Sequence, residues 1–264
     1  MTHFLHIAYE GTKFRGWQRQ PNVRSVQETI EETLKKIFAR DITVYGCGRT
    51  DAGVHASQYY LHIHLTEEYD FDLKFRINKN LPDEIVVYDV IKMEDKQHCR
   101  YDAIARTYDY FIHLEKNPVL VRYSSFYEIK DLDIPAMQMA AALIQNYDDF
   151  RAICKQPDFH KHTRCNVSHS KLFVSDDAKR LRFTITANRF LRGMVRLCIY
   201  YLLEVGEGRM TVEAFEQTLA NKIVIDSMRP SFPNGLFLSK VVYPYLSLPP
   251  RENICSLLKQ GLKD

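Results

Sequence analysis

The sequence of 264 residues predicts an α+β fold made of two related halves, each a split β-α-β (ferredoxin-like) unit, with a mixed, mainly antiparallel sheet. Three observations predict it. A hydrophobic content of 45% allows a chain of this length to bury a sizeable core. Segments with the two-residue period of strands and the 3.6-residue period of helices follow a strand-helix-strand-strand-helix-strand order. The second half repeats this order without repeating the sequence.

In the first half, residues 3–9 form the first predicted strand. Ser25 and Glu28 have the spacing of a capping box, so a helix begins there. Its apolar stripe consists of Val26, Ile30, Leu34, Ile37 and Phe38. The other predicted elements are strands at 42–45, 59–65 and 85–91 and a helix at 71–79. Within the strand at 59–65, His62 and His64 alternate with apolar residues, and we interpret both as ordinary strand residues.

In the second half, the same periods predict four strands and two main helices, with a further helix after Thr211. The strands lie at 105–113, 165–174, 181–187 and 236–243, and the main helices at 135–145 and 191–205. Gly206 is placed to end the last of these. We therefore predict an N-terminal half at 1–97, a C-terminal half at 98–246 and a tail of unassigned role at 247–264.

Cysteine usage and hydropathy indicate a cytoplasmic protein. The six cysteines form no Cys-x-x-Cys pair, and the first residues contain no apolar core of a signal peptide. We therefore expect reduced thiols. No apolar run approaches the roughly 20 residues that span a bilayer, so a membrane role is not expected.

Positive charge is distributed unevenly, although the net charge is only +3. Residues 151–196 contain eleven Lys and Arg against three Asp, a net charge of +8 that leaves −5 elsewhere. A second basic group, Lys13, Arg15, Arg19 and Arg24, surrounds Trp17, the only tryptophan. Both groups suit a phosphate backbone, although any single lysine or arginine also serves to solubilise an exposed face.

The stretch 46–56, Gly-Cys-Gly-Arg-Thr-Asp-Ala-Gly-Val-His-Ala, places one carboxylate on a glycine-rich loop. Gly48 and Gly53 can adopt backbone conformations that other residues disfavour, and Arg49 stands two positions before Asp51. This pattern favours a site in which Asp51 is the chemical centre. The plainer alternative is a tight turn in which Asp51 only accepts hydrogen bonds from nearby amides.

This loop resembles the signature loop of the tRNA pseudouridine synthase A family, whose pattern is Gly-Arg-Thr-Asp-Ala-Gly-Val-His with a catalytic Asp. Other blocks resemble the family in the same order. They are residues 9–21, 80–83, 98–103, 106–110, 190–196 and 235–238. The combination spans about residues 3 to 243 and is far more specific than any single block.

The resemblance implies two related α+β halves with the active site in a central cleft. Asp51 would be the catalytic residue, either adding to ribose C1′ or removing a C2′ proton. Tyr108 matches the family tyrosine, which could hold the uracil face and remove the C5 proton. Arg196 matches the arginine that pairs with the catalytic aspartate and keeps it ionised. Leu236 matches the apolar residue that lines the uracil pocket.

Each of these last three residues also has a plainer interpretation. Tyrosines in alternating strands are commonly core residues, and the chain has sixteen of them. Arg196 would be one more surface cation on a helix, except that Phe190, Met194 and Leu197 predict a partly buried face there. Leu236 would be an ordinary core residue of a strand.

The resemblance further implies that the substrate is uridine at positions 38, 39 and 40 in the anticodon stem-loop of tRNA. It implies a homodimer and no cofactor. Arg49 matches the loop arginine that occupies the space left by the flipped base. Selection of three adjacent sites favours recognition by shape and backbone, so we expect Lys13, Arg15, Trp17 and Arg19 to contact RNA, and we expect no DNA partner.

Two alternatives compete with this interpretation. One is a zinc site built from Cys154, His160, His162 and Cys165, but only the His-x-His pair has a compact spacing, so we expect no metal. The other is a tRNA-binding protein without catalytic activity. The presence of Asp51 together with Tyr108 and Arg196 argues against it.

Overall fold

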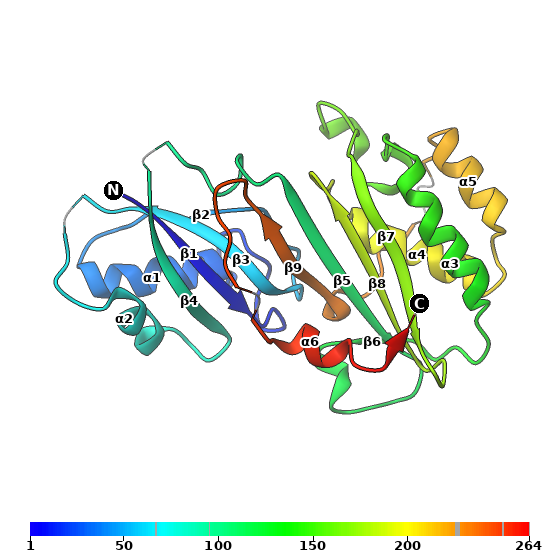
Figure 1. Ribbon diagram of the computed structural model, residues 1–264, viewed down its shortest axis with the longest axis horizontal. Helices are drawn as coiled ribbons and strands as arrows, with labels where there is room; N and C mark the ends of the chain where they lie inside the picture. Colours follow the sequence, from blue (N-terminus) through cyan, green and yellow to red (C-terminus); the bar gives the residue numbers. More distant parts are fainter. Residues whose placement is uncertain (67, 95, 225–227, 250, 264) are drawn as a thin grey trace. The chain divides into compact units, whose positions relative to one another are not determined.

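The computed structural model describes residues 1–66, 68–94, 96–224, 228–249 and 251–263. These residues fold as two compact units (Figure 1). Unit 1 contains Met1–Ile104 and Phe237–Arg251, and unit 2 contains Ala105–Leu236 and Glu252–Asp264. The functional division at residues 97 and 246 stays a prediction. None of the helices in the described residues is long and apolar enough to cross a membrane.

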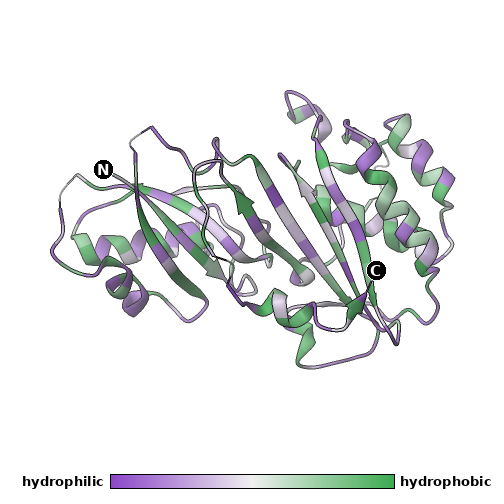
Figure 2. Cartoon of the chain, in the orientation of Figure 1, coloured by the Kyte–Doolittle hydropathy of each residue, from purple (hydrophilic) through white to green (hydrophobic). Residues whose placement is uncertain are grey.

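Unit 1 follows the predicted order of elements. They are β1 (Thr2–Tyr9), α1 (Val26–Phe38), β2 (Tyr45–Gly46), β3 (His55–His64), α2 (Leu73–Asn80) and β4 (Ile85–Met93), joined late in the chain by β9 (Leu236–Val242). β1 lies between β3 and β4 and is antiparallel to both, whereas β9 runs parallel to β3. Ser25 caps α1 by accepting from the Glu28 amide, and this helix carries apolar and polar stripes, visible as green and purple in Figure 2.

The predicted strand at 42–45 is wrong for all but its last residue. Ile42 and Val44 are buried, so the alternation in the sequence is real. However, the backbone of Val44 bonds to side chains of α1: its carbonyl accepts from Gln27 at 3.1 Å, and its amide donates to Glu31 at 3.3 Å. Because helix side chains satisfy these groups, β2 begins only at Tyr45.

Unit 2 contains the remaining strands and helices. They are β5 (Ala105–His113), β6 (Ser125–Phe126), α3 (Ile134–Leu143), β7 (Val167–Ser175), β8 (Arg180–Ala187), α4 (Met194–Gly206), α5 (Val212–Ala220), α6 (Ile254–Leu258) and β10 (Leu262–Lys263). The antiparallel order is β10-β7-β8-β5, with β6 parallel to β5. Both units therefore have mixed, mainly antiparallel pairing, which confirms the predicted α+β fold class.

The helix α4 differs from its prediction at both ends. It begins at Met194 because Gly193 precedes it in the left-handed conformation, at φ +71°. It ends at Gly206 as predicted, but the left-handed glycine is Gly208, at φ +69°. A Cβ on Gly206 would collide with the sulfur of Met137 in α3, so Gly206 allows two helices to approach closely.

The C-terminal tail, which the sequence left unassigned, docks on unit 2. A capping box at Asn253 starts α6, and β10 pairs with β7 at the edge of the sheet. Lys259 follows α6 and reaches Asp109 of β5, which is only 1% exposed, at 2.9 Å. Arg182 of β8 reaches the same carboxylate at 3.1 Å. Two cations thus neutralise one buried acid, and one of them comes from the tail.

Candidate active site

The Asp51 loop connects β2 to β3, and Asp51 itself is half-buried. Arg49 points to solvent, whereas Thr50 is buried and its hydroxyl lies 2.8 Å from that of Tyr9. The Val54 amide donates to the Asp51 carbonyl at 3.2 Å and closes a turn in which Gly53 has φ +77°. The predicted role of Gly53 is therefore confirmed.

The N-terminal block packs directly on this loop. The Trp17 amide donates to the Thr50 carbonyl at 3.1 Å, and the Gly53 amide donates to the Phe14 carbonyl at 3.2 Å. Gly16 has φ +91°, and a Cβ there would lie 2.5 Å from the Thr50 carbonyl oxygen. Two sequence blocks that are some 30 residues apart thus form one structure, and a glycine is required where they touch.

Gly48, which the sequence analysis grouped with Gly53, does not use this conformational freedom. Its φ lies outside the left-handed region, and a Cβ there would meet no atom within 4 Å.

We expect Gly16→Ala to lower the free energy of unfolding by at least about 1 to 2 kcal/mol, because L-residues are strained at the φ of Gly16 and the Thr50 carbonyl cannot move away. Gly48→Ala should change it by less than about 0.5 kcal/mol. Urea unfolding of both variants tests this pair, and equal effects would contradict it.

Aromatic rings support the loop from inside. Trp17, only 3% exposed, stacks on Tyr59 with ring centroids 4.2 Å apart. The Tyr59 hydroxyl donates to the Gly48 carbonyl at 2.6 Å, and burial raises the pKa of Tyr59 well above its ordinary value. This hydroxyl therefore stays a donor and holds the start of the loop.

The basic residues predicted to contact RNA differ in their surroundings. Lys13 forms an ion pair with Glu84, and Arg19 one with Glu31 at 3.1 Å. Arg15 and Arg49 are exposed, and neither side chain has an ion-pair partner among the residues that the structure describes. These two arginines are the better placed to meet a phosphate, since they need not break an existing pair.

In unit 2, Tyr108 is half-buried on β5, opposite Ile185 of β8. Its ring meets Phe190 edge-on, with centroids 4.9 Å apart and an interplanar angle of 83°. Tyr110, two residues along the same strand, faces the same side of the sheet. Its buried hydroxyl donates to the Phe232 carbonyl at 2.8 Å, so this face of β5 is joined to the segment before β9.

Arg196 and Leu236 meet the same segment. Arg196, half-buried in the first turn of α4, donates from Nε to the Ser231 carbonyl at 2.6 Å, and its carbonyl accepts from the Ser231 amide. Leu236 is 5% exposed and follows a short 3₁₀ turn at Pro233–Gly235. The structure thus links the faces that carry Tyr108, Arg196 and Leu236 through residues 230–236. Sequence reasoning missed residues 230–234, whose only signal is the turn-forming run Pro-Asn-Gly at 233–235.

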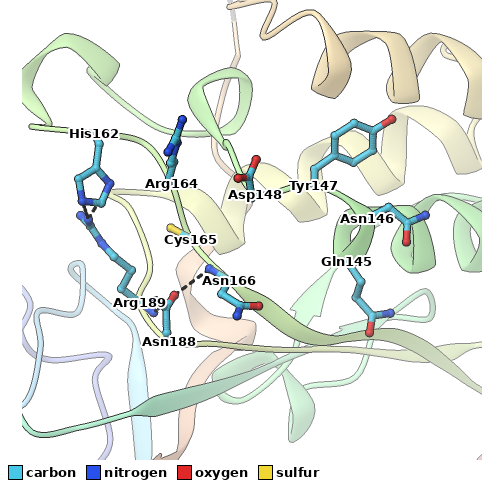
Figure 3. A pocket seen from close by; sticks show the side chains of 10 residues that line it. All are labelled: Gln145, Asn146, Tyr147, Asp148, His162, Arg164, Cys165, Asn166, Asn188 and Arg189. Carbon is cyan, nitrogen blue, oxygen red and sulfur yellow. Dashed lines mark hydrogen bonds between the residues drawn. The ribbon is translucent and has the colours of Figure 1, made fainter.

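A cavity of about 570 Å³ in unit 2 is lined by residues 145–148 and by residues of the basic segment 151–196 (Figure 3). Arg164 and Arg189 supply positive charge, with Asp148 as the one acidic side chain of its lining. Arg189 lies against the ring of His162, at 3.1 Å from Nε2, and the Asn188 side chain accepts from the Asn166 amide at 2.8 Å. Cationic and amide groups of this kind suit a nucleic-acid backbone.

The structure does not assemble the zinc site considered above. Cys154 and Cys165 are buried, and burial raises the pKa of each thiol to about 11. His162 is exposed and engages Arg189. Among the described residues, the only group of three or more ligand side chains is a different one, formed by His62, His98 and Cys99.

Comparison with known proteins gives consistent results across most of the chain. A family model described as tRNA pseudouridine synthase matches residues 6–102 and 140–244. The chain is 36% identical to tRNA pseudouridine synthase A of Porphyromonas gingivalis over 244 residues, 91% of this chain and 96% of that relative. It is 38% identical to that of Bacteroides thetaiotaomicron over 244 residues, covering 92% and 90%. It is 34% identical to that of Streptococcus agalactiae serotype III over 248 residues, covering 92% and 96%.

Proposed function

Because the chain belongs to the tRNA pseudouridine synthase family, we propose that it isomerises uridine to pseudouridine at positions 38, 39 and 40 in the anticodon stem-loop of tRNA. The observation that carries this proposal is the Asp51 loop. Its backbone is fixed by Gly53 and by contact with Gly16, so that one half-buried carboxylate is held at a defined place. Such positioning is what a group that acts on a single bond requires.

The reaction breaks the bond from ribose C1′ to uracil N1, turns the detached base and joins C1′ to C5. Asp51 acts at the sugar, either by adding to C1′ or by removing a C2′ proton. The ring of Tyr108 holds the uracil face while the base turns, and its hydroxyl is the base for the C5 proton. The edge-on contact with Phe190 supports this role, since it fixes the plane of the Tyr108 ring.

Arg196 is assigned to the Asp51 carboxylate, and Leu236 is assigned to the uracil of the substrate. Asp51 lies in unit 1, and Arg196 and Leu236 lie in unit 2 or at its boundary. We propose that the guanidinium pairs with Asp51 and keeps it ionised. The bonds from Arg196 to residues 230 and 231 support this assignment, because they restrict the guanidinium before substrate binds. Leu236 is buried beside that segment and is suited to line an apolar pocket for uracil.

RNA binding is assigned to exposed cations of both units. Arg49 occupies the space that the flipped base leaves in the stack, and Arg15, Lys13 and Arg19 contact the phosphate backbone. The buried Trp17 contributes through the loop that it supports. The cavity at Arg164 and Arg189 provides a further backbone contact in unit 2. We further propose that the protein acts as a homodimer in the cytoplasm, where its six free, buried cysteines stay reduced.

The test is to incubate the purified protein with unmodified tRNA and map pseudouridine by position. We expect product at uridines 38, 39 and 40 and none in a tRNA with cytidine at all three positions. Product at other positions only would overturn the proposed site preference. Tight tRNA binding without any product would show that the chain is a non-catalytic binding protein.

A further inference from the structure

His62, His98 and Cys99 form a group that the proposed reaction does not use. Each offers one ligand atom, and the three atoms lie within 4.8 Å of one another. Nδ1 of His62 is 3.2 Å from Sγ of Cys99. All three residues belong to unit 1, His62 from β3 and the other two from the turn after β4. We propose that this group binds a zinc ion with two imidazoles and one thiolate.

The separations are close to those of a zinc site. With bonds of about 2.0 to 2.3 Å, neighbouring ligands of a tetrahedral zinc ion are about 3.3 to 3.8 Å apart. The pair His62–Cys99, at 3.2 Å, is already near that range. No separation exceeds 4.8 Å, so the widest must shorten by no more than about 1 to 1.5 Å. Three protein ligands leave a fourth position for water, an arrangement that zinc accepts.

Two of the ligands are held rigidly. The ring of His62 lies between Tyr45 and Phe4, with centroids 4.9 and 5.9 Å away and interplanar angles of 14° and 28°. Cys99 is fully buried, and its carbonyl accepts from the Tyr243 hydroxyl at 2.5 Å. A preorganised pair of this kind loses little freedom when an ion binds.

His98 is the ligand that moves. It is half-buried beside the exposed Tyr101, so an ion can enter from this side. Its Nδ1 accepts from the Arg100 amide at 3.1 Å, and the ring gives up this exposed bond when it turns onto the metal.

Binding exchanges one proton for the ion. The Cys99 thiol now donates to the Tyr45 carbonyl at 3.0 Å, and S–H is a weak donor. When Zn²⁺ forms its bond to sulfur, this proton passes to the buffer. Because Tyr45 belongs to β2, directly before the Asp51 loop, the ion would tie the turn at residues 98–101 to the root of that loop.

The experiment adds cobalt(II) alone to metal-free, full-length protein. We expect one cobalt per chain, a thiolate-to-cobalt charge-transfer band, the intense d–d bands of tetrahedral cobalt, and loss of both when zinc is added. Cys99→Ala should abolish the charge-transfer band and weaken zinc binding by more than about 100-fold, beyond what loss of a supporting contact alone costs. His98→Gln, at the half-buried ligand, should weaken it by at least about 10-fold.

Matched controls are Cys165→Ala, another buried thiol, and His162→Asn, an exposed imidazole. Both should bind cobalt and zinc like the wild type. The proposal fails if the wild type shows no charge-transfer band, if the band survives in Cys99→Ala, or if Cys165→Ala abolishes it. Circular dichroism without metal shows that each variant is folded, and if Cys99→Ala is not, unchanged zinc affinity in His98→Gln overturns the proposal. No RNA is needed, so the result is independent of the proposed synthase activity.

Discussion

An Asp51→Asn variant is expected to bind tRNA like the wild type and to lose pseudouridine formation by more than about 10³-fold. The amide keeps the shape of the side chain but can neither add to C1′ nor accept the C2′ proton. The loop should stay in place, because its contacts run through the backbone of Thr50 and Gly53 and through the Tyr59 hydroxyl. Loss of activity with unchanged stability therefore separates chemistry from folding.

The measurement is single-turnover pseudouridine formation beside tRNA affinity and urea unfolding. Asp70→Asn, an exposed aspartate outside the blocks that resemble the family, is the matched control and should keep full activity. Activity of Asp51→Asn within about 10-fold of the wild type would remove Asp51 from its catalytic role. Loss of tRNA binding would instead assign it to recognition.

An Arg182→Met variant is expected to lower the free energy of unfolding by about 3 kcal/mol. Arg182 is 15% exposed and faces a carboxylate, Asp109, that is 1% exposed. Removing one cation from a buried pair typically costs 3 to 5 kcal/mol, and we expect the lower end because Lys259 still contacts Asp109. Arg182 also covers the ring of Phe173 at 4.2 Å, and Met retains part of that packing.

Two comparisons make this prediction specific. Adding Asp109→Asn to Arg182→Met removes the carboxylate charge as well, and the double variant should be more stable than Arg182→Met alone. Lys179→Met breaks a surface ion pair with Glu115 and should cost less than about 1 kcal/mol. If Arg182→Met costs no more than Lys179→Met in urea unfolding, the buried charge cluster does not stabilise the fold.

Regular elements with a strong local signal could be predicted from the sequence. The strand at 105–113 has the bounds of β5, and α1 begins after its Ser25 cap, because both signals lie within one short segment. The strand at 42–45 failed for a tertiary reason: side chains of α1 took the backbone bonds that a neighbouring strand would have made. The alternation of apolar and polar residues predicts which side chains are buried. It does not predict which groups the backbone will bond to.

In the candidate site, too, features within one continuous sequence block could be predicted, whereas contacts between distant parts of the chain could not. The sequence marks Asp51 and the glycines beside it, since one continuous block carries them. It does not show that Gly16 touches Thr50, or that Arg196 is held by residues 230 and 231, because these contacts join distant parts of the chain. The contact between His62 and Cys99 could not be predicted either, because the two residues are 37 positions apart. From periodicity alone, His62 is an ordinary strand residue.

The position of β9 has a consequence for synthesis on the ribosome. His55 of β3 pairs with Phe237 of β9, and unit 1 ends only at Arg251. The nascent chain therefore carries an open sheet edge on β3 while residues 105–236 of unit 2 are made, and unit 2 in turn lacks β10 until residues 262–263 emerge. Long-range pairing of this kind is slow and leaves strand edges exposed. We expect unit 1 to complete its sheet only after β9 has emerged, and unit 2 only after β10 has emerged.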